Sequence, residues 1–213
     1  MRGSNVFYRV CFCLARFGIG IFYWLDVSGR ENIPDGAALV CANHSSMLDP
    51  FFIAFAFGIN CHMHIIAKLV LFKIPVLSAV LRKLGMISVD RDILDTRTIK
   101  MTLGYLKKGE KVTIFPEGTR VTEDDSVEAK NGAIRLAEHS GVPVVPTFIP
   151  RKKPLFRKIP IVIGVPYPVE KVKGRRTPEE YADLSDILMG KIKDLNPGKG
   201  SKRTKAGHKE INA

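Results

Sequence analysis

Residues 37–57 read AALVCANHSSMLDPFFIAFAF, and the predicted fold depends on this stretch. Its first part, residues 37–42, is a short apolar run that is typical of a buried strand. Its last part, residues 51–57, is strongly apolar, follows a proline and ends at Gly58, which indicates a helix. A polar turn therefore joins a buried strand to a helix, and α/β folds are built by repeating this unit.

The same alternation of strands and helices continues on both sides of this stretch. We expect further strands at residues 26–33, 62–67, 86–89, 111–115, 142–149 and 159–165. We expect further helices at residues 74–83, 96–108, 128–140 and 178–195. The two prolines at the start of the 142–149 strand suggest an edge or a wall of the sheet. The pattern predicts an α/β fold with a mixed, mostly parallel central sheet flanked by helices.

The composition is that of a globular protein with a basic surface. The chain has 213 residues, of which 46% are apolar, so it can bury a core without disulfides or metals. Its four cysteines have no spacing typical of zinc sites, and we expect neither a metal nor a bound cofactor. The net charge of +12 favours an acidic partner: nucleic acid, an anionic membrane or an anionic substrate. A nucleic-acid module is disfavoured because no block of aromatic and basic residues is present.

Residues 6–25 read VFYRVCFCLARFGIGIFYWL and form a distinct N-terminal segment. Arg9 and Arg16 are its only charged residues, and their spacing of seven puts them on one helical face. Such a helix can lie in the membrane interface, span the bilayer or be buried in a core. Interfacial attachment fits best, because each arginine near mid-span would cost about 2.5–3.5 kcal/mol.

We therefore divide the chain into three parts. Residues 1–25 are predicted to be a hydrophobic, membrane-associating helix, residues 26–195 an α/β domain, and residues 196–213 a basic disordered tail. Residues 151–158, RKKPLFRK, are a second candidate for contact with an anionic membrane, because they place leucine and phenylalanine between cations.

His44 and Asp49 follow the first buried strand, where ligands bind in open α/β sheets. Pro50 favours the first turn of a helix, which makes Asp49 the expected N-cap and residues 44–48 a turn. Such a turn can fold His44 back onto the Asp49 carboxylate. A histidine held in this way can act as a general base.

Two further segments place polar residues after apolar strands. FPEGTR, residues 115–120, forms a turn whose Arg120 could bind a phosphate. GMISVDR, residues 85–91, likewise places a basic residue, Arg91, after an apolar strand. Each of these segments alone is more common as a surface turn or a solvated charge cluster.

Taken together, these segments resemble the motifs of the glycerophospholipid acyltransferase family, in particular of its 1-acyl-glycerol-3-phosphate (lysophosphatidic acid) acyltransferases. The resemblance covers residues 26–167, in which NHSSMLDP, GMISVDR, FPEGTR and VPVVP occur in the family's order. Lys68 and the KNGA segment at residues 130–133 also fit the family's pattern.

The resemblance implies a role for each candidate residue. His44 would be the general base, and Asp49 would fix its ring; these two are the expected catalytic residues. The expected substrate-binding residues are Lys68, Arg91, Glu117, Gly118, Thr119 and Arg120. The arginines would bind the acceptor's phosphate, Gly118 would give the backbone room, and Glu117 would either orient the glycerol part or hold the turn.

The resemblance also implies the reaction. A fatty acyl group would move from a thioester, acyl-CoA or acyl-acyl carrier protein, to the sn-2 hydroxyl of 1-acyl-glycerol 3-phosphate (lysophosphatidic acid), giving phosphatidic acid for phospholipid synthesis. The thioester would be a co-substrate rather than a cofactor. We expect the enzyme at the cytoplasmic face of the cell membrane, attached peripherally or by a single segment. Glycerol 3-phosphate or another lysolipid as acceptor, or a non-catalytic membrane-binding protein, are the alternatives.

Overall fold

The computed structural model of the chain describes residues 6–90, 96–121, 129–172 and 174–198. The strands in these residues are β1 (Tyr23–Ser28), β2 (Ala38–Ala42), β3 (Met63–Lys68), β4 (Ile87–Val89), β5 (Lys111–Ile114), β6 (Val144–Phe148) and β7 (Arg157–Ile163). The helices are α1 (Val6–Gly20), α2 (Asp49–Phe57), α3 (Pro75–Lys83), α4 (Thr96–Lys107), α5 (Gly132–Ser140) and α6 (Pro178–Asp194). Two short 3₁₀ helices are η1 (Arg30–Asn32) and η2 (Leu69–Lys73). Most of the predicted basic tail, residues 199–213, lies outside the described residues.

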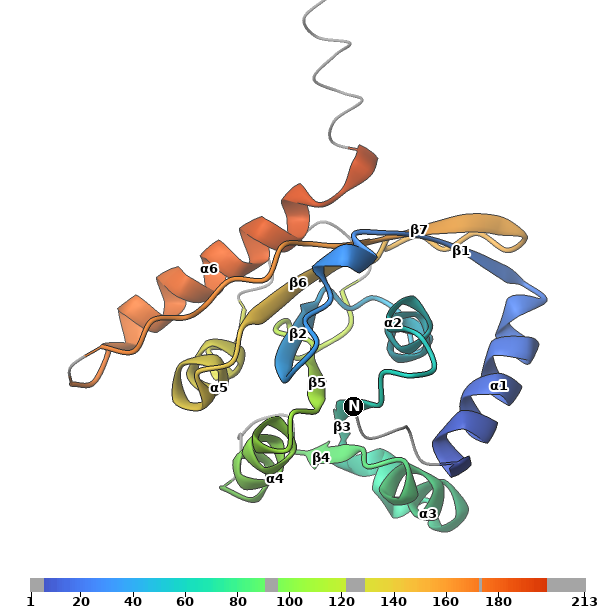
Figure 1. The fold of residues 1–213 in the computed structure, drawn as a ribbon, viewed down its shortest axis with the longest axis horizontal. Helices are drawn as coiled ribbons and strands as arrows, with labels where there is room; N and C mark the ends of the chain where they lie inside the picture. Colours follow the sequence, from blue (N-terminus) through green and yellow to red (C-terminus); the bar gives the residue numbers. More distant parts are fainter. Residues whose placement is uncertain (1–5, 91–95, 122–128, 173, 199–213) are drawn as a thin grey trace, which may run out of the picture.

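The described strands form one seven-stranded sheet in the order β1-β7-β6-β2-β5-β3-β4. All neighbouring pairs in it are parallel except β6 and β7, which are antiparallel. The prediction of a mixed, mostly parallel sheet flanked by helices is confirmed (Figure 1).

Each face of the sheet packs against its own set of helices. On one face, Ile134 and Leu136 of α5 and Ile192 of α6 belong to a buried cluster with residues of β2 and β5. On the other face, Phe52 and Phe55 of α2 belong to a second cluster, against which residues of α1 pack. Figure 1 shows α4, α5 and α6 on one side of the strands and α1 and α2 on the other.

Strand β2 lies in the middle of the sheet and is buried along its whole length. Its side chains alternate between the two clusters: Leu39 and Cys41 pack with α5, while Ala38, Val40 and Ala42 pack with α2. This explains why the strand is apolar at every position, because both of its faces are covered. The carboxyl end of β2 leads directly into the polar turn at residues 43–48.

The N-terminal segment differs from the predicted helix over residues 1–25. Helix α1 ends at Gly20, and Tyr23–Ser28 form β1, which pairs in parallel with β7. The predicted strand at residues 26–33 thus begins earlier and ends at Ser28, before Gly29, whose φ of 78° favours glycine. Tyr23 and Trp24, which were predicted to continue the helix, instead occupy a half-buried and an exposed position of an edge strand.

Helix α1 presents an apolar stripe outward. Its most exposed large apolar side chains are Val6, Val10, Leu14 and Phe17. Arg9 and Arg16 contact the domain instead: Arg9 donates to Asn60 Oδ1 at 3.0 Å, and Arg16 lies over the Phe55 ring. In the part of the chain that the structure describes, no helix has both the length and the apolar character needed to cross a membrane.

The prolines of the VPVVP segment suggested an edge or a wall of the sheet, and for strand β6, which begins within this segment, the edge is wrong. The strand lies between β7 and β2. The Pro146 carbonyl accepts from the Gly164 N–H, so the side of Pro146 that lacks an N–H faces the chain at the end of β7. The ladder between β6 and β7 begins only at Thr147. Pro146 is therefore tolerated, because no ladder hydrogen bond is lost at its position.

Candidate active site

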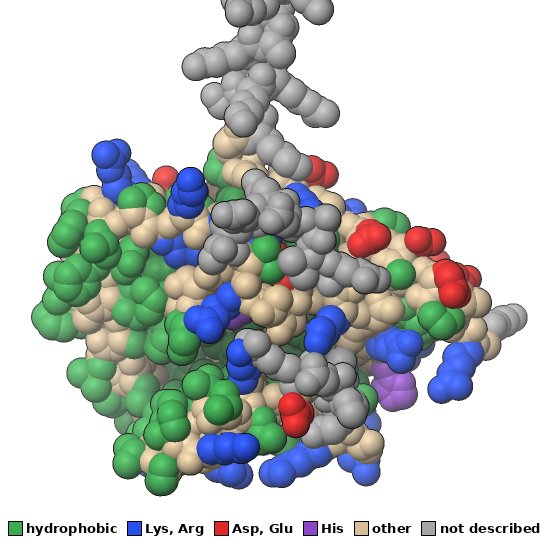
Figure 2. All heavy atoms as spheres, turned by 180° about the vertical axis from the view of Figure 1, so that it is seen from behind, with side chains coloured by type: hydrophobic (Ala, Val, Ile, Leu, Met, Phe, Trp, Pro, Cys, Tyr) green, Lys and Arg blue, Asp and Glu red, His purple; other side chains and the backbone are tan. Residues whose placement is uncertain are grey.

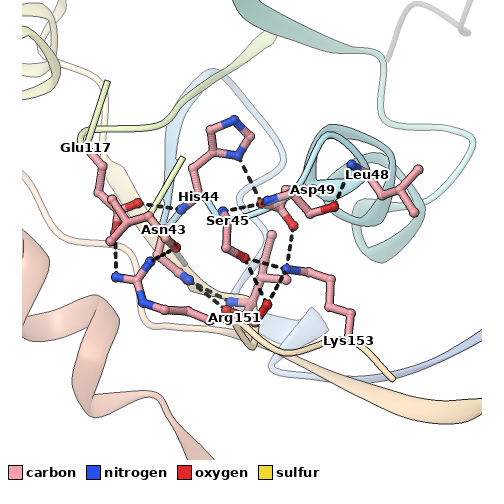
Figure 3. A network of polar contacts seen from close by, with 11 residues as sticks. Asn43, His44, Ser45, Leu48, Asp49, Glu117, Arg151 and Lys153 are labelled. Carbon is pink, nitrogen blue, oxygen red and sulfur yellow. Dashed lines mark hydrogen bonds and ion pairs between the residues drawn. The ribbon is translucent and has the colours of Figure 1, made fainter. Parts of the chain in front are cut away.

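The His44 and Asp49 side chains meet in the turn between β2 and α2. His44 Nδ1 lies 2.9 Å from Asp49 Oδ2 (Figure 3). Asp49 Oδ2 also accepts the backbone N–H groups of Ser45 and Ser46, each at 2.7 Å. The turn therefore wraps around one carboxylate oxygen and fixes the direction in which it meets the histidine ring.

Asp49 does not cap its helix in the predicted way. Helix α2 begins at Asp49 itself, with Leu48 as the N-cap and no side-chain cap hydrogen bond. The carboxylate points back into the turn because the amides there and His44 are its hydrogen-bond donors. This loss of the cap is consistent with a carboxylate committed to orienting His44.

The second oxygen of Asp49 lies against a cation. Lys153 Nζ is 2.9 Å from Asp49 Oδ1, and the carboxyl group is fully buried. Burial alone would raise the pKa of Asp49, but the hydrogen bond from His44, the charge and hydrogen bond of Lys153 and the Ser45 amide outweigh it, so the pKa lies below its usual value. Asp49 is therefore an anion at neutral pH.

The ionised carboxylate determines the tautomer of His44. An anion on Oδ2 can only accept, so Nδ1 carries the hydrogen, and in the neutral form of the ring Nε2 is the nitrogen that keeps its lone pair. The ring stacks on Phe115 with centroids 4.2 Å apart, and the side chain is 17% exposed. A neutral imidazole held from both sides, with its second nitrogen unprotonated, is suited to accept a proton from a substrate.

Glu117 connects the two loops of the site. Its Oε2 accepts the His44 backbone N–H at 2.9 Å, and its Oε1 is paired with Arg151 at 2.8 Å. Both oxygens thus face protein groups, and Glu117 is buried. Of the two roles open to Glu117 from the sequence, the geometry favours holding the turn.

Asn43 fixes the other end of the same turn. Its amide donates to the Ile149 carbonyl at 2.7 Å and accepts the Ile149 N–H at 2.9 Å. Because Ile149 follows β6, this pair joins the ends of two neighbouring strands. The backbone of His44 is therefore held to Glu117 on one side and, through Asn43, to the segment after β6 on the other.

A cleft of about 610 Å³ opens beside His44. Its apolar walls come mainly from α1, α2, η2 and α3, and include Phe12, Ala15, Phe51, Phe55, Leu71, Leu77, Leu81 and Met86. Polar and charged residues at its other side include Lys68, Asp90, Arg120 and Lys130. In Figure 2, apolar side chains gather on the side of the molecule where α1 and α3 lie, next to lysine and arginine side chains.

The predicted substrate-binding residues divide into three groups. Lys68, Gly118 and Arg120 line the cleft. Glu117 and Thr119 are not among its described lining residues, and Thr119 is exposed at the surface of the turn. Arg91 lies outside the described residues, although Asp90, which precedes it, lines the cleft.

Gly118 occupies a position that only glycine fits well. Its φ is +63°, and a Cβ there would lie 2.8 Å from both Cδ and Cε of Lys130. The structure thus offers a physical reason for the glycine that we expected to give the backbone room. The space beside it is taken by a lysine side chain that reaches the cleft.

Two residues that form ion pairs with Glu117 and Asp49 were not predicted as part of the site. Arg151 and Lys153 belong to residues 151–158, which we expected to face a membrane as one basic cluster. This expectation is wrong for both, because their side chains turn inward to Glu117 and Asp49 and are 13% and 5% exposed. A single sequence offers no signal for this, since the partners are more than 30 residues away along the chain.

The geometry defines a class of site: a histidine base oriented by a carboxylate, at the carboxyl end of a parallel strand, in a cleft lined by apolar residues and several cations. Residues 25–150 match the family described as Acyltransferase, and the chain belongs to this family.

Several similar proteins are named 1-acyl-sn-glycerol-3-phosphate acyltransferases. The chain is 30% identical over 195 residues to that of Bacillus subtilis, covering 88% of this chain and 96% of the relative. It is 32% identical over 150 residues to that of Borreliella burgdorferi, covering 65% of this chain and 58% of the relative. The crystal structure of the 1-acyl-sn-glycerophosphate (LPA) acyltransferase PlsC from Thermotoga maritima matches with a TM-score of 0.66 and 27% identity, over 90% of this chain and 78% of that chain.

Proposed function

We propose that this acyltransferase moves a fatty acyl group from a thioester to the sn-2 hydroxyl of 1-acyl-glycerol 3-phosphate, forming phosphatidic acid. One observation carries the proposal: His44, held by Asp49, lines a cleft whose walls combine apolar side chains with the cations Lys68 and Arg120. An acceptor with an acyl chain, a free hydroxyl and a phosphate presents the groups that these surfaces complement. The names of the relatives from Bacillus subtilis and Borreliella burgdorferi support the same acceptor.

In the reaction that we propose, His44 Nε2 takes the proton of the acceptor hydroxyl as its oxygen attacks the thioester carbonyl. Asp49, already hydrogen-bonded to Nδ1, stabilises the imidazolium that forms. The tetrahedral intermediate then collapses, the carbon–sulfur bond breaks, and the thiolate takes the proton from His44. The acyl group ends as an ester on the acceptor oxygen, and no acyl-enzyme is needed.

The oxyanion of that intermediate needs hydrogen-bond donors. The backbone N–H groups of His44, Ser45 and Ser46 donate to Glu117 and Asp49, so they do not serve this role. We propose that the cationic side chains that line the cleft beside His44 stabilise the oxyanion instead. The acceptor's phosphate would be bound by Arg120 and Arg91, with Lys68, which lines the same cleft, as a further cation.

A transfer assay over several acceptors and both donor types tests this proposal. The acceptors are 1-acyl-glycerol 3-phosphate, glycerol 3-phosphate and a lysolipid whose phosphate carries a neutral or zwitterionic headgroup. The donors are acyl-CoA and acyl-acyl carrier protein, each a thioester that needs no bound cofactor. The proposal predicts the highest kcat/KM with 1-acyl-glycerol 3-phosphate, and a higher value with either other acceptor would overturn it.

We also propose that the enzyme works on the cytoplasmic face of the membrane, attached peripherally through the outer stripe of α1. Leu14 and Phe17 of this stripe are 68% and 76% exposed, and buried apolar area would bind them to lipid. Deleting residues 1–25 would destroy part of β1, so a double Leu14→Ser, Phe17→Ser variant is the better test. It should lose binding to neutral vesicles in sedimentation, whereas Ile187→Ser on α6 should not; equal binding of both variants would contradict the proposal.

A further inference from the structure

The buried lysine at position 153 is unusual in its contacts. Its ammonium group lies 2.9 Å from Asp49 Oδ1, 2.6 Å from Ser45 Oγ and 3.4 Å from the Arg151 carbonyl oxygen. It thus forms an ion pair with the carboxylate and hydrogen bonds with the Ser45 hydroxyl and the Arg151 carbonyl. The side chain is 5% exposed, although lysine is among the residues least often buried.

These contacts place Lys153 behind the carboxylate, opposite the histidine. Asp49 Oδ2 faces His44 and the turn amides, while Asp49 Oδ1 faces Lys153. Ser45, whose hydroxyl accepts from Lys153, is also the residue whose amide donates to Asp49. Lys153 therefore touches both the carboxylate and the turn that holds it, without lining the described walls of the cleft.

We propose that Lys153 is a positioning residue of the reaction, which fixes the Asp49 carboxylate against His44 and balances its charge. The inference rests on the proposed function only in assigning His44 as the base. With Lys153 present, the buried pair of Asp49 and Lys153 has no net charge, so the ammonium offsets the attraction of the carboxylate for a proton on the imidazole. A general base must be unprotonated when it meets its substrate.

The other charged groups around His44 do not supply the same balance. Glu117 and Arg151 neutralise each other where the turn meets the 115–120 loop. Lys68, Asp90, Arg120 and Lys130 line the cleft on the side where the substrate would bind. If Lys153 loses its charge, the negative charge of Asp49 is left uncompensated beside the ring and favours the imidazolium.

Three substitutions at this position separate charge, hydrogen bonding and packing. Lys153→Arg keeps the charge, Lys153→Gln keeps a donor without charge, and Lys153→Met keeps only the apolar stem. Lys152→Met is the matched control, because it removes the same charge from the exposed neighbouring residue. The measurements are kcat and KM over a range of pH, with thermal unfolding to show that each variant is folded.

We expect Lys153→Gln and Lys153→Met to lower kcat by roughly tenfold to 150-fold, the range for a lost hydrogen bond to a charged group, with little change in acceptor KM. The acidic limb of the pH–rate profile should move to higher pH in both. Lys153→Arg should recover much of the rate, and Lys152→Met should match the unmodified enzyme. A folded Lys153→Gln with unchanged kcat and an unmoved acidic limb would overturn the proposal.

A readout that needs no turnover distinguishes a failure of this inference from a failure of the proposed function. The ring signals of His44, followed by NMR against pH, should titrate at higher pH in Lys153→Gln than in the unmodified protein. Identical titration curves overturn the inference whatever the acceptor is. If Lys153→Met does not fold, the comparison of Lys153→Gln with Lys153→Arg carries the same test.

Discussion

Replacing Asp49 with asparagine should damage both stability and activity, because the carboxylate has more donors around it than an amide can satisfy. Oδ2 accepts from His44, Ser45 and Ser46, and Oδ1 faces Lys153. The NH₂ group of the introduced side chain would have to point at one of these sets of donors. Either the buried ammonium of Lys153 would then lose its anionic partner, or the N–H groups of the turn would be left without an acceptor.

The expected magnitude follows from that burial. Removing one partner of a buried ion pair costs about 3–5 kcal/mol, far more than the loss of a helix cap. For a protein of this size, this corresponds to a fall in Tm of roughly 6–20 °C. The rate should fall by about 10⁴, as expected when the carboxylate that orients a catalytic histidine becomes an amide.

The pH dependence of the stability gives a second, independent check. Because the pKa of Asp49 is lowered by folding, its contribution to stability is complete above the unfolded value of about 3.9 and is lost as the pH falls through the folded value. The difference between the unmodified protein and Asp49→Asn should therefore be largest at neutral pH and shrink in acid.

Urea unfolding at several pH values measures this difference, with Asp186→Asn as the control. Asp186 is an exposed residue of α6, and its substitution should change stability by no more than about 0.5 kcal/mol. A loss below about 1 kcal/mol for Asp49→Asn, or a loss that does not depend on pH, would refute the argument from buried donors.

Two other substitutions test the cleft. Gly118→Ala should lower the free energy of unfolding in urea by about 1–2 kcal/mol, because the backbone is left-handed there. It should also lower kcat/KM, because the new Cβ displaces the Lys130 side chain. An unchanged kcat/KM would mean that Lys130 does not contact substrate. Arg120→Ala and Arg91→Ala should each raise the KM for the acceptor by roughly tenfold to 150-fold, because each loses a charge-assisted contact to the phosphate. A change confined to the KM for the thioester would instead assign these arginines to binding of the donor.

The sequence predicted the parts of the fold that depend on local patterns. The buried strand at residues 38–42, the polar turn and the helix that follows were all expected, because a strand covered on both faces must be apolar throughout. The helix expected from residue 178 begins there as α6, where Thr177 and Glu180 form a capping box with both of its hydrogen bonds. His44 and Asp49 could be paired because proline at position 50 fixes where the helix begins.

The features that were missed depend on residues far apart in the chain. Residues 23–25, two aromatic residues and a leucine, have the composition of the preceding helix, and only pairing with β7 draws them into the sheet. Lys153 and Arg151 read as surface cations, and only the fold brings them to Asp49 and Glu117. The cap at Asp49 was predicted from helix rules, but donors from the turn outcompete the helix for its carboxylate.

The formation of phosphatidic acid by purified protein, compared with that by His44→Ala, tests the central claim most directly. With 1-acyl-glycerol 3-phosphate and a thioester donor, we predict rapid transfer by the unmodified chain and a rate lower by about 10²–10⁴ for the variant. The His44 side chain is partly exposed, and among the described residues Phe115 is the one aromatic ring on which it stacks. The variant should therefore stay folded, as measured by thermal unfolding. Near-normal transfer by a folded His44→Ala protein would contradict the account.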